Sequence, residues 1–266
     1  FSNAIRELET NLGAELVDRT NRTVTITATG QEVAVQARLV LRDVESLIET
    51  ARGPVEPLTG ELRLGVIPTI APFILPPALP RLRKHYPDLE LLLIEDQTDR
   101  ILQRLMDGEL DVLLLALPWE MRGVEELPLF RDEFCLACRQ GTDRVDPENY
   151  RFTRLDADSI LLLEDGHCLR DHALAACRIR GGEKVRRFGA SSLLTLVEMV
   201  DADLGITFLP EMARGSSLLR NTRVKLWPLG ENSYRTIGLV WRKGSRRAAE
   251  FRLLGDFIRD HRPKNA

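Results

Sequence analysis

The sequence of 266 residues predicts an α/β protein in which a two-lobed domain follows a long helix and a small helix-plus-hairpin module. Three patterns predict this architecture. Short apolar runs alternate with helical stretches from Glu61 onward, a long helical segment carries apolar residues at spacings of 3 and 4, and a short amphipathic segment precedes a β-like run. The length also suits two or three modules.

The first module is expected within residues 1–28. Ile5, Leu8 and Leu12 share one face of a short helix, and Gly13 follows as a stop signal. The alternating run 23–27 then predicts a strand of a small hairpin. A short helix followed by a hairpin is typical of a winged helix-turn-helix DNA-binding domain, here expected to be partial because its first helices are missing.

A long linker helix with a hinge is expected within residues 29–59. The apolar positions of the helix from Thr29 to Arg52 are spaced 4, 3, 4, 3 and 4 residues apart, which is typical of a coiled-coil seam. The alternative, one helix lying on a globular body, would show a wider apolar stripe. The Pro and Gly residues of segment 53–60 end the helix. The seam consists of Val33, Ala37, Val40, Val44, Leu47 and Ala51.

Residues 60–266 are expected to form the α/β domain, with a mostly parallel sheet and a cleft between two lobes. Lobe I is assigned to about 60–132 and 235–266, and lobe II to about 133–234. Buried strands are expected at Leu62–Ile67, Leu89–Glu95, Val112–Leu117, Ile160–Glu164 and Ile237–Trp241. Helices are expected at Leu75–His85, Asp99–Asp107, Cys168–Ile179, Ser192–Asp201 and Arg247–Asp260.

The composition excludes several classes of protein. The 37 Lys and Arg residues nearly balance the 40 Asp and Glu residues, and the net charge of -3 excludes a polycationic nucleic-acid coat but not a small DNA-reading module. The longest apolar run, Leu89–Ile94, is too short to span a membrane. The sequence starts with neither Met nor a signal region, so we expect a cytoplasmic protein that has lost its beginning. Four cysteines are too few for a disulfide scaffold.

Two of these cysteines lie in a segment suited to redox chemistry. Asp165 and Gly166 end a strand and precede a helix, so Cys168 falls in its first turn, where free N–H groups and the helix dipole favour a thiolate. His167 and Arg170 add possible positive charge nearby. These are the conditions for a cysteine that reacts with a peroxide.

Helical geometry limits what Cys177 can do. Nine residues after Cys168, it would lie on the opposite face of an intact helix. The two Cα atoms would be roughly 13.5 Å apart, beyond the limit of about 7 Å for a disulfide. A bond between them therefore requires the helix to refold, which would couple oxidation to conformation. The alternative stays open that Cys168 is a capping residue and Cys177, which we expect to be buried, a core residue.

The other pair, Cys135 and Cys138, is interpreted as packing residues. The segment around them reads as a strand, in which positions three apart face opposite sides. No further Cys or His pair follows at the spacing of a zinc site, so we expect neither a metal nor a cofactor.

The whole chain resembles LysR-type transcriptional regulators, and more narrowly the OxyR-like hydrogen-peroxide sensors of that family. Residues 1–9 (FSNAIRELE) look like the recognition helix, and 12–20 (LGAELVDRT) with 27–30 (TATG) resemble the wing and the start of the linker helix. The peroxide-sensor motif is 164–171 (EDGHCLRD) with Cys177 at the family's spacing. Segments 64–69 (LGVIPT), 95–98 (EDQT) and 235–240 (RTIGLV) also match.

The resemblance implies a periplasmic-binding-protein-like regulatory domain and a role for each matching residue. Cys168 would be the peroxidatic cysteine and Cys177 the resolving one. Arg235 would stabilise charge near the reactive sulfur, and Asp171 would take part in proton movement. The peroxide pocket would comprise Thr69, Thr98, Gly166, His167, Asp171 and Arg235.

The pocket threonines have a plain physical rationale. Both follow apolar strands, at the strand ends where open α/β sheets bind ligands, and a hydroxyl can both donate to and accept from a peroxide. The alternative is that Thr69 and Thr98 cap the helices that follow. Where members of the family commonly carry a His before a Phe, this sequence has Arg187, so the local field is expected to be more positive. His172 is expected to face solvent.

The sequence therefore predicts a DNA-binding transcriptional regulator, not an enzyme, that senses hydrogen peroxide by disulfide formation. The resemblance implies operator DNA, a thiol reductant such as a glutaredoxin or thioredoxin system, RNA polymerase and further copies of the chain, as a homodimer or homotetramer, as partners. One alternative is a LysR-type regulator gated by a small metabolite in the cleft; another is a thiol peroxidase. The DNA-facing candidates are Ser2, Asn3, Arg6 and Arg22, each of which could also be an ordinary solvated residue.

Overall fold

The computed structural model describes residues 2–19, 24–52, 56–177, 182–230 and 232–262. Helix α1 (Ser2–Leu12) ends at Gly13, as expected, and strands β1 (Val17–Arg19) and β2 (Val24–Ile26) pair antiparallel. The Glu9 carboxylate joins these parts, because it accepts the N–H groups of Leu16 at 2.9 Å and Val17 at 3.1 Å.

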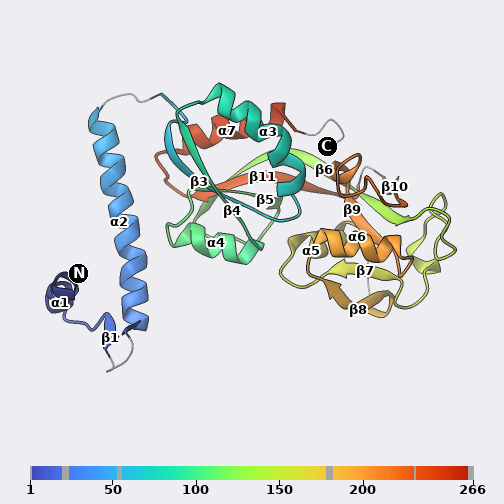
Figure 1. Ribbon diagram of the computed structural model, residues 1–266, viewed down its shortest axis with the longest axis horizontal. Helices are drawn as coiled ribbons and strands as arrows, with labels where there is room; N and C mark the ends of the chain where they lie inside the picture. The colour runs from blue at the N-terminus through green and yellow to red at the C-terminus, as the bar shows by residue number, and fades with distance from the viewer. Residues whose placement is uncertain (1, 20–23, 53–55, 178–181, 231, 263–266) are drawn as a thin grey trace.

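Helix α2 (Ala28–Arg52) is the predicted long helix and lies as a rod beside the α/β domain (Figure 1). Its start packs on the hairpin so closely that a Cβ at Gly30 would lie 2.1 Å from the Leu16 carbonyl oxygen. Three residues of the predicted seam, Val40, Val44 and Leu47, are 60%, 45% and 60% exposed. An apolar stripe therefore faces solvent in the single chain.

The large sheet is mixed, so the expectation of a mostly parallel sheet is wrong. Only its first three strands pair in parallel, and every other pairing in this sheet is antiparallel. The chain passes to the second lobe along β6, which has the direction of the parallel set, and returns along β11, which lies between β5 and β6 and runs antiparallel to both. The strand order is β10-β6-β11-β5-β3-β4, with β9 also paired to β6. Their bounds are β3 (Gly60–Val66), β4 (Leu89–Glu95), β5 (Val112–Leu117), β6 (Val124–Arg139), β9 (Thr207–Pro210), β10 (Val224–Pro228) and β11 (Tyr234–Arg242).

Strand β6 connects the two lobes. Its first ten residues, 124–133, pair with β11 in the first lobe. From Phe134 onward it pairs instead with β9 and β10 in the second lobe. The polypeptide therefore crosses from the first lobe to the second near residue 133. On the first-lobe side of this crossing, β6 is paired with β11.

Helices cover both faces of the first lobe. Figure 1 shows α3 (Ala71–His85) and α7 (Ala248–Asp260) over one face of the sheet and α4 (Thr98–Met106) over the other. Helix α3 begins four residues before the expected start, because Pro72 fits the first turn of a helix. Within the described residues, no helix combines the length and apolarity needed to cross a bilayer.

The second lobe contains the cysteine helix. Strands β7 (Ile160–Leu163) and β8 (Val185–Ala190) pair in parallel, and α6 (Leu193–Asp201) packs against both. Helix α5 begins at Cys168, as expected, and ends at Ala176, before the expected end at Ile179, which lies outside the described residues. The core of buried apolar side chains is continuous across both lobes.

Candidate functional site

Two buried threonines lie where the parallel strands of the first lobe end. Thr69 follows β3 and Thr98 is the first residue of α4, after β4, and each is 1% exposed. Carboxyl ends of neighbouring parallel strands lie at the same edge of a sheet, so the topology brings the two loops together. Neither threonine is the N-cap residue of its helix: Ile70 and Gln97 hold those positions, without a side-chain capping bond, so the capping alternative does not apply.

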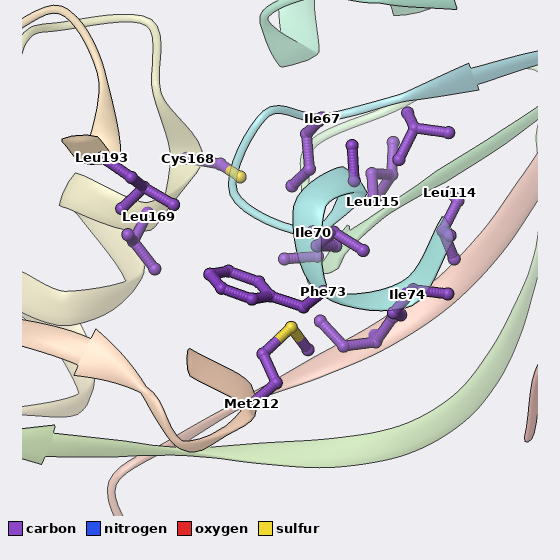
Figure 2. Close-up of a cluster of buried hydrophobic side chains, with 14 of the residues drawn as sticks. Ile67, Ile70, Phe73, Ile74, Leu114, Leu115, Cys168, Leu169, Leu193 and Met212 are labelled. Atoms are coloured by element: carbon purple, nitrogen blue, oxygen red, sulfur yellow. The ribbon is translucent and has the colours of Figure 1, made fainter. Parts of the chain in front are cut away.

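Cys168 reaches this edge from the second lobe. It is the first residue of α5, and its side chain is 1% exposed. Figure 2 shows its sulfur directed at the loop between β3 and α3, which carries Ile67. The preceding Gly166 has a φ of +95°, and a Cβ there would lie 2.8 Å from Oε1 of Gln97, so glycine suits this position in two ways.

The two lobes line one small recess. Thr69 and Thr98 come from the first lobe, and Gly166, His167 and Cys168 come from the second. In this conformation the recess does not admit a water-sized molecule. The remaining lining residues are Ile67, Pro68 and Gln97.

Arg235 lies directly behind Thr69 and is 1% exposed. Its Nη1 donates to Thr69 Oγ1 at 3.1 Å, and its Nη2 donates to the Thr69 carbonyl at 2.9 Å. Its Nε donates at 2.9 Å to Asp132 Oδ2, in an ion pair whose side chains are both 0% exposed. Burial raises the pKa of the Asp132 carboxyl, although the charge of Arg235 opposes this.

Burial also raises the pKa of the Cys168 thiol, which corrects the expectation that the helix start favours a thiolate. The Thr98 hydroxyl and the charge of Arg235 lower this pKa, but burial outweighs them. The Thr98 Oγ1 is itself buried without a hydrogen bond of ordinary geometry. The surroundings of the sulfur are therefore polar, but too dry to favour the anion.

Cys177 caps the C-terminal end of α5, and all four cysteines are free thiols. It is partly exposed, not buried as expected, although burial still raises its pKa to about 12. The helix between the two thiols is intact. Cys168 and Cys177 are therefore held apart, as the helical spacing requires.

Three further side chains singled out in the sequence, Asp171, Arg187 and His172, do not line the recess. Asp171 is exposed on α5, and its charge raises the pKa of Cys168. Arg187 is exposed on β8, so the expectation that it makes the pocket more positive finds no contact to support it. His172 does not face solvent as expected. It packs edge-on against Trp119 and lies 3.1 Å from the Pro118 carbonyl, because the loop after β5 folds over α5.

The DNA-facing candidates are only partly described. Asn3 and Arg6 are exposed on α1, and Ser2 is the first residue of that helix. Arg22 lies outside the described residues.

Comparison with known families decides the class of protein. Residues 56–263 match the LysR substrate binding domain. This chain belongs to the LysR family of transcriptional regulators.

Relatives of this LysR-family chain extend over nearly its whole length. The Acinetobacter baylyi HTH-type transcriptional regulator EstR is 40% identical over 260 residues, which are 97% of this chain and 86% of the relative. The Escherichia coli DNA-binding transcriptional dual regulator OxyR is 40% identical over 259 residues, which are 97% of this chain and 85% of the relative.

Two solved structures of OxyR proteins are similar to the fold of this LysR-family chain. The reduced regulatory domain of Vibrio vulnificus OxyR2 has a TM-score of 0.74 at 40% identity and covers 78% of this chain and 98% of that one. A Cys-to-Ser variant of Corynebacterium glutamicum OxyR with hydrogen peroxide bound has a TM-score of 0.73 at 35% identity. That match covers 98% of this chain and 82% of the other.

Sequence reasoning missed Gln97 and Asp132. Gln97 lies inside the matched segment EDQT, next to Thr98, so its position was an available signal. Asp132 lies in a charged stretch that gave no signal of burial. Cys135 and Cys138 are buried in β6 with pKa values raised to about 12, as packing residues would be.

Proposed function

We propose that this LysR-family regulator senses hydrogen peroxide through Cys168 and Cys177. The observation that carries the proposal is the placement of Cys168. Its buried side chain lies at the start of α5 in a recess that Thr69 and Thr98 also line. Arg235 donates to Thr69, and a second free thiol lies at the far end of the same helix. The OxyR relatives, whose names include hydrogen peroxide-inducible genes activators, support it.

The chemistry runs in two steps that balance. The Cys168 thiol gives up its proton, the thiolate attacks one oxygen of hydrogen peroxide, and the O–O bond breaks. The departing hydroxide takes up that proton, leaving a sulfenic acid and one water. The Cys177 thiol then attacks the oxidised sulfur, the S–S bond forms, and the hydroxyl leaves as a second water. Thr69 and Thr98 would bind the peroxide, Arg235 would stabilise the developing charge, and a thiol reductant such as a glutaredoxin or thioredoxin system would restore both thiols.

Peroxide entry and disulfide formation both require movement. The recess does not admit a water-sized molecule, so Gly166, His167 or the facing loops shift to let peroxide in. The second step requires α5 to unfold, since an intact helix keeps the sulfurs apart. Because α5 packs across the edge of the first lobe, its refolding would change how the lobes pack and thereby the placement of the DNA-binding modules (Figure 2).

The partners follow from the family and from the exposed surfaces. The α1 helix, with Ser2, Asn3 and Arg6, and the hairpin would contact operator DNA, with RNA polymerase as a further partner at the promoter. The apolar stripe of α2 would pair two copies into a homodimer or a homotetramer built from dimers.

The test is the response of the purified protein to micromolar peroxide. We expect one disulfide per chain by mass spectrometry and a changed operator footprint, both lost in Cys168→Ser and in Cys177→Ser. Cys138→Ala is the matched control, because Cys138 is buried in β6 away from the recess, and it should keep the disulfide. Absence of a disulfide would favour a regulator gated by a metabolite. Rapid multi-turnover consumption of peroxide with a reductant would favour a thiol peroxidase.

A further inference from the structure

Asp132 and Arg235 form the one ion pair among the described residues in which both side chains are 0% exposed. They lie directly opposite each other on the antiparallel strands β6 and β11. A buried charge requires a partner, so each residue holds the other in place. The register of the two strands therefore determines where the Arg235 guanidinium lies.

Both carboxylate oxygens of Asp132 are occupied. Oδ2 accepts from Nε of Arg235 at 2.9 Å, and Oδ1 accepts from the Met212 N–H at 3.2 Å. Since Met212 belongs to the second lobe, Asp132 connects the guanidinium to both lobes. With Nε held in this way, the Nη1 and Nη2 edge of the guanidinium is turned toward Thr69.

This arrangement gives the Thr69 hydroxyl a direction. A guanidinium can only donate hydrogen bonds, so Thr69 Oγ1 must accept from Nη1. Its own proton is then left to donate to another acceptor. Thr69 also lines the recess in front of Cys168, so that proton is available to an oxygen of a bound peroxide.

We propose that Asp132 is a positioning residue for the peroxide reaction: it fixes Arg235 so that the Thr69 hydroxyl acts as a donor toward peroxide at Cys168. The inference rests on the proposed function and adds a residue that does not line the recess. Asp132 gives Cys168 its preference for peroxide over other electrophiles. It acts only through Arg235 and Thr69.

The test compares two reactions of Cys168 in a Cys177→Ser background, which isolates the first step. Rate constants are measured with hydrogen peroxide and with iodoacetamide. Iodoacetamide is a neutral reagent whose rate depends on thiolate formation and on access to the sulfur, but not on a hydrogen bond donated by the Thr69 hydroxyl. The variants are Asp132→Asn, Arg235→Gln and the two combined. Asp256→Asn is the matched control, because it breaks the exposed ion pair with Arg259 on α7.

We expect Asp132→Asn to lower the ratio of the peroxide rate to the iodoacetamide rate by about tenfold or more, as misplaced reacting groups do. Arg235→Gln should lower it similarly, and the double variant should be no lower than Arg235→Gln alone, because Asp132 acts through Arg235. Asp256→Asn should leave the ratio unchanged. An unchanged ratio in Asp132→Asn, or losses that multiply in the double variant, would overturn the inference.

The role of Asp132 can be tested even where the single variant Asp132→Asn does not fold. Where Asp132→Asn fails to fold because it leaves Arg235 buried without its carboxylate, the double variant removes both charges and should fold. Its ratio is then compared with that of Arg235→Gln alone: equality supports the inference, and a further fall refutes it. A Cys177→Ser protein with no preference for peroxide would instead overturn the proposed function, and the inference with it.

Discussion

The Cys168 thiol is subject to opposing effects from its surroundings. Removal of water raises its pKa, whereas the Thr98 hydroxyl and the Arg235 charge lower it. Since burial dominates, a low pKa is not what would make this thiol selective. Selectivity for peroxide would have to come from groups that bind the reacting peroxide itself, and the two threonines are placed to do so.

The two threonines should differ in what they contribute. Thr69→Val should slow the reaction of Cys168 with peroxide while affecting alkylation by iodoacetamide much less, because Thr69 directs a donor to the peroxide. Thr98→Val, the comparison variant, removes a hydroxyl that also lowers the pKa of Cys168, so it should slow the alkylation clearly as well as the peroxide reaction. Pseudo-first-order rates with each reagent measure this. Equal slowing of both reactions by Thr69→Val would mean that Thr69 acts on thiolate formation or access.

At the scale of elements, α5 is a short helix, and His172 at its middle contacts the first lobe. His172 contacts the Pro118 carbonyl and the edge of Trp119, and Ser233 donates to the Ala176 carbonyl at the helix end at 3.3 Å. The Nδ1 atom of His172 is buried without a hydrogen-bond partner. A proton at Nδ1 would therefore bring an uncompensated charge into a dry contact.

This contact predicts a dependence on pH. Burial lowers the pKa of His172 in the folded state below its ordinary value of 6.5, so the unfolded chain binds the proton first. The contribution of this group to stability is complete above pH 6.5 and decreases as the pH falls toward the folded-state pKa. Urea unfolding at pH 7.5 and 5.5 should show less loss of stability for His172→Gln than for the parent.

The control for that measurement is His85→Gln, which removes an exposed imidazole at the end of α3. It should retain the parent's loss of stability between the two pH values. If His172→Gln lost as much stability on acidification as the parent, His172 would not be the group responsible.

The stripe on α2 makes a second prediction at this scale. Leu47 is 60% exposed, and Leu47→Glu would place a charge in the seam between two copies. We expect the association constant of the dimer to fall by at least about tenfold while the α/β domain keeps its stability, measured by sedimentation equilibrium and urea unfolding. Gln31→Glu adds the same charge at an exposed polar position of α2 and should associate as the parent does.

In the whole molecule, the site lies where the two lobes meet. We propose that lobe I comprises about 60–132 and 235–266 and lobe II about 133–234, since β6 changes its pairing partners between Glu133 and Phe134. The ion pair of Asp132 and Arg235 lies at this crossing. A change in α5 would therefore act at the place where small shifts reorient one lobe against the other.

Some of this architecture could be predicted because the pattern is local. Apolar runs located β3, β4, β5 and β7, and the heptad-like spacing located α2. The first half of β6 was missed because Glu125, Glu126 and Arg131 interrupt any apolar run, although antiparallel pairing tolerates a strand with one polar face.

The site was only partly predictable for the same reason. The resemblance named Thr69, Thr98, Gly166 and His167, which line the recess with Cys168. The partner of Arg235 could not be found in this way, because Asp132 is 103 residues away and the pair depends on strand register. The sequence predicts a solvent-facing His172, because nothing near it in the chain shows that the loop at Pro118 folds over it.

The sequence by itself determined the elements and one constraint on the chemistry: Cys168 and Cys177 cannot bond while the helix between them is intact. That constraint depends only on helical geometry and on a separation of nine residues. The tertiary structure alone decided which groups surround Cys168, that burial raises its pKa, and that Asp132 holds Arg235 against Thr69. These features arise from contacts between distant segments, which the packing of the two lobes creates and local patterns do not encode.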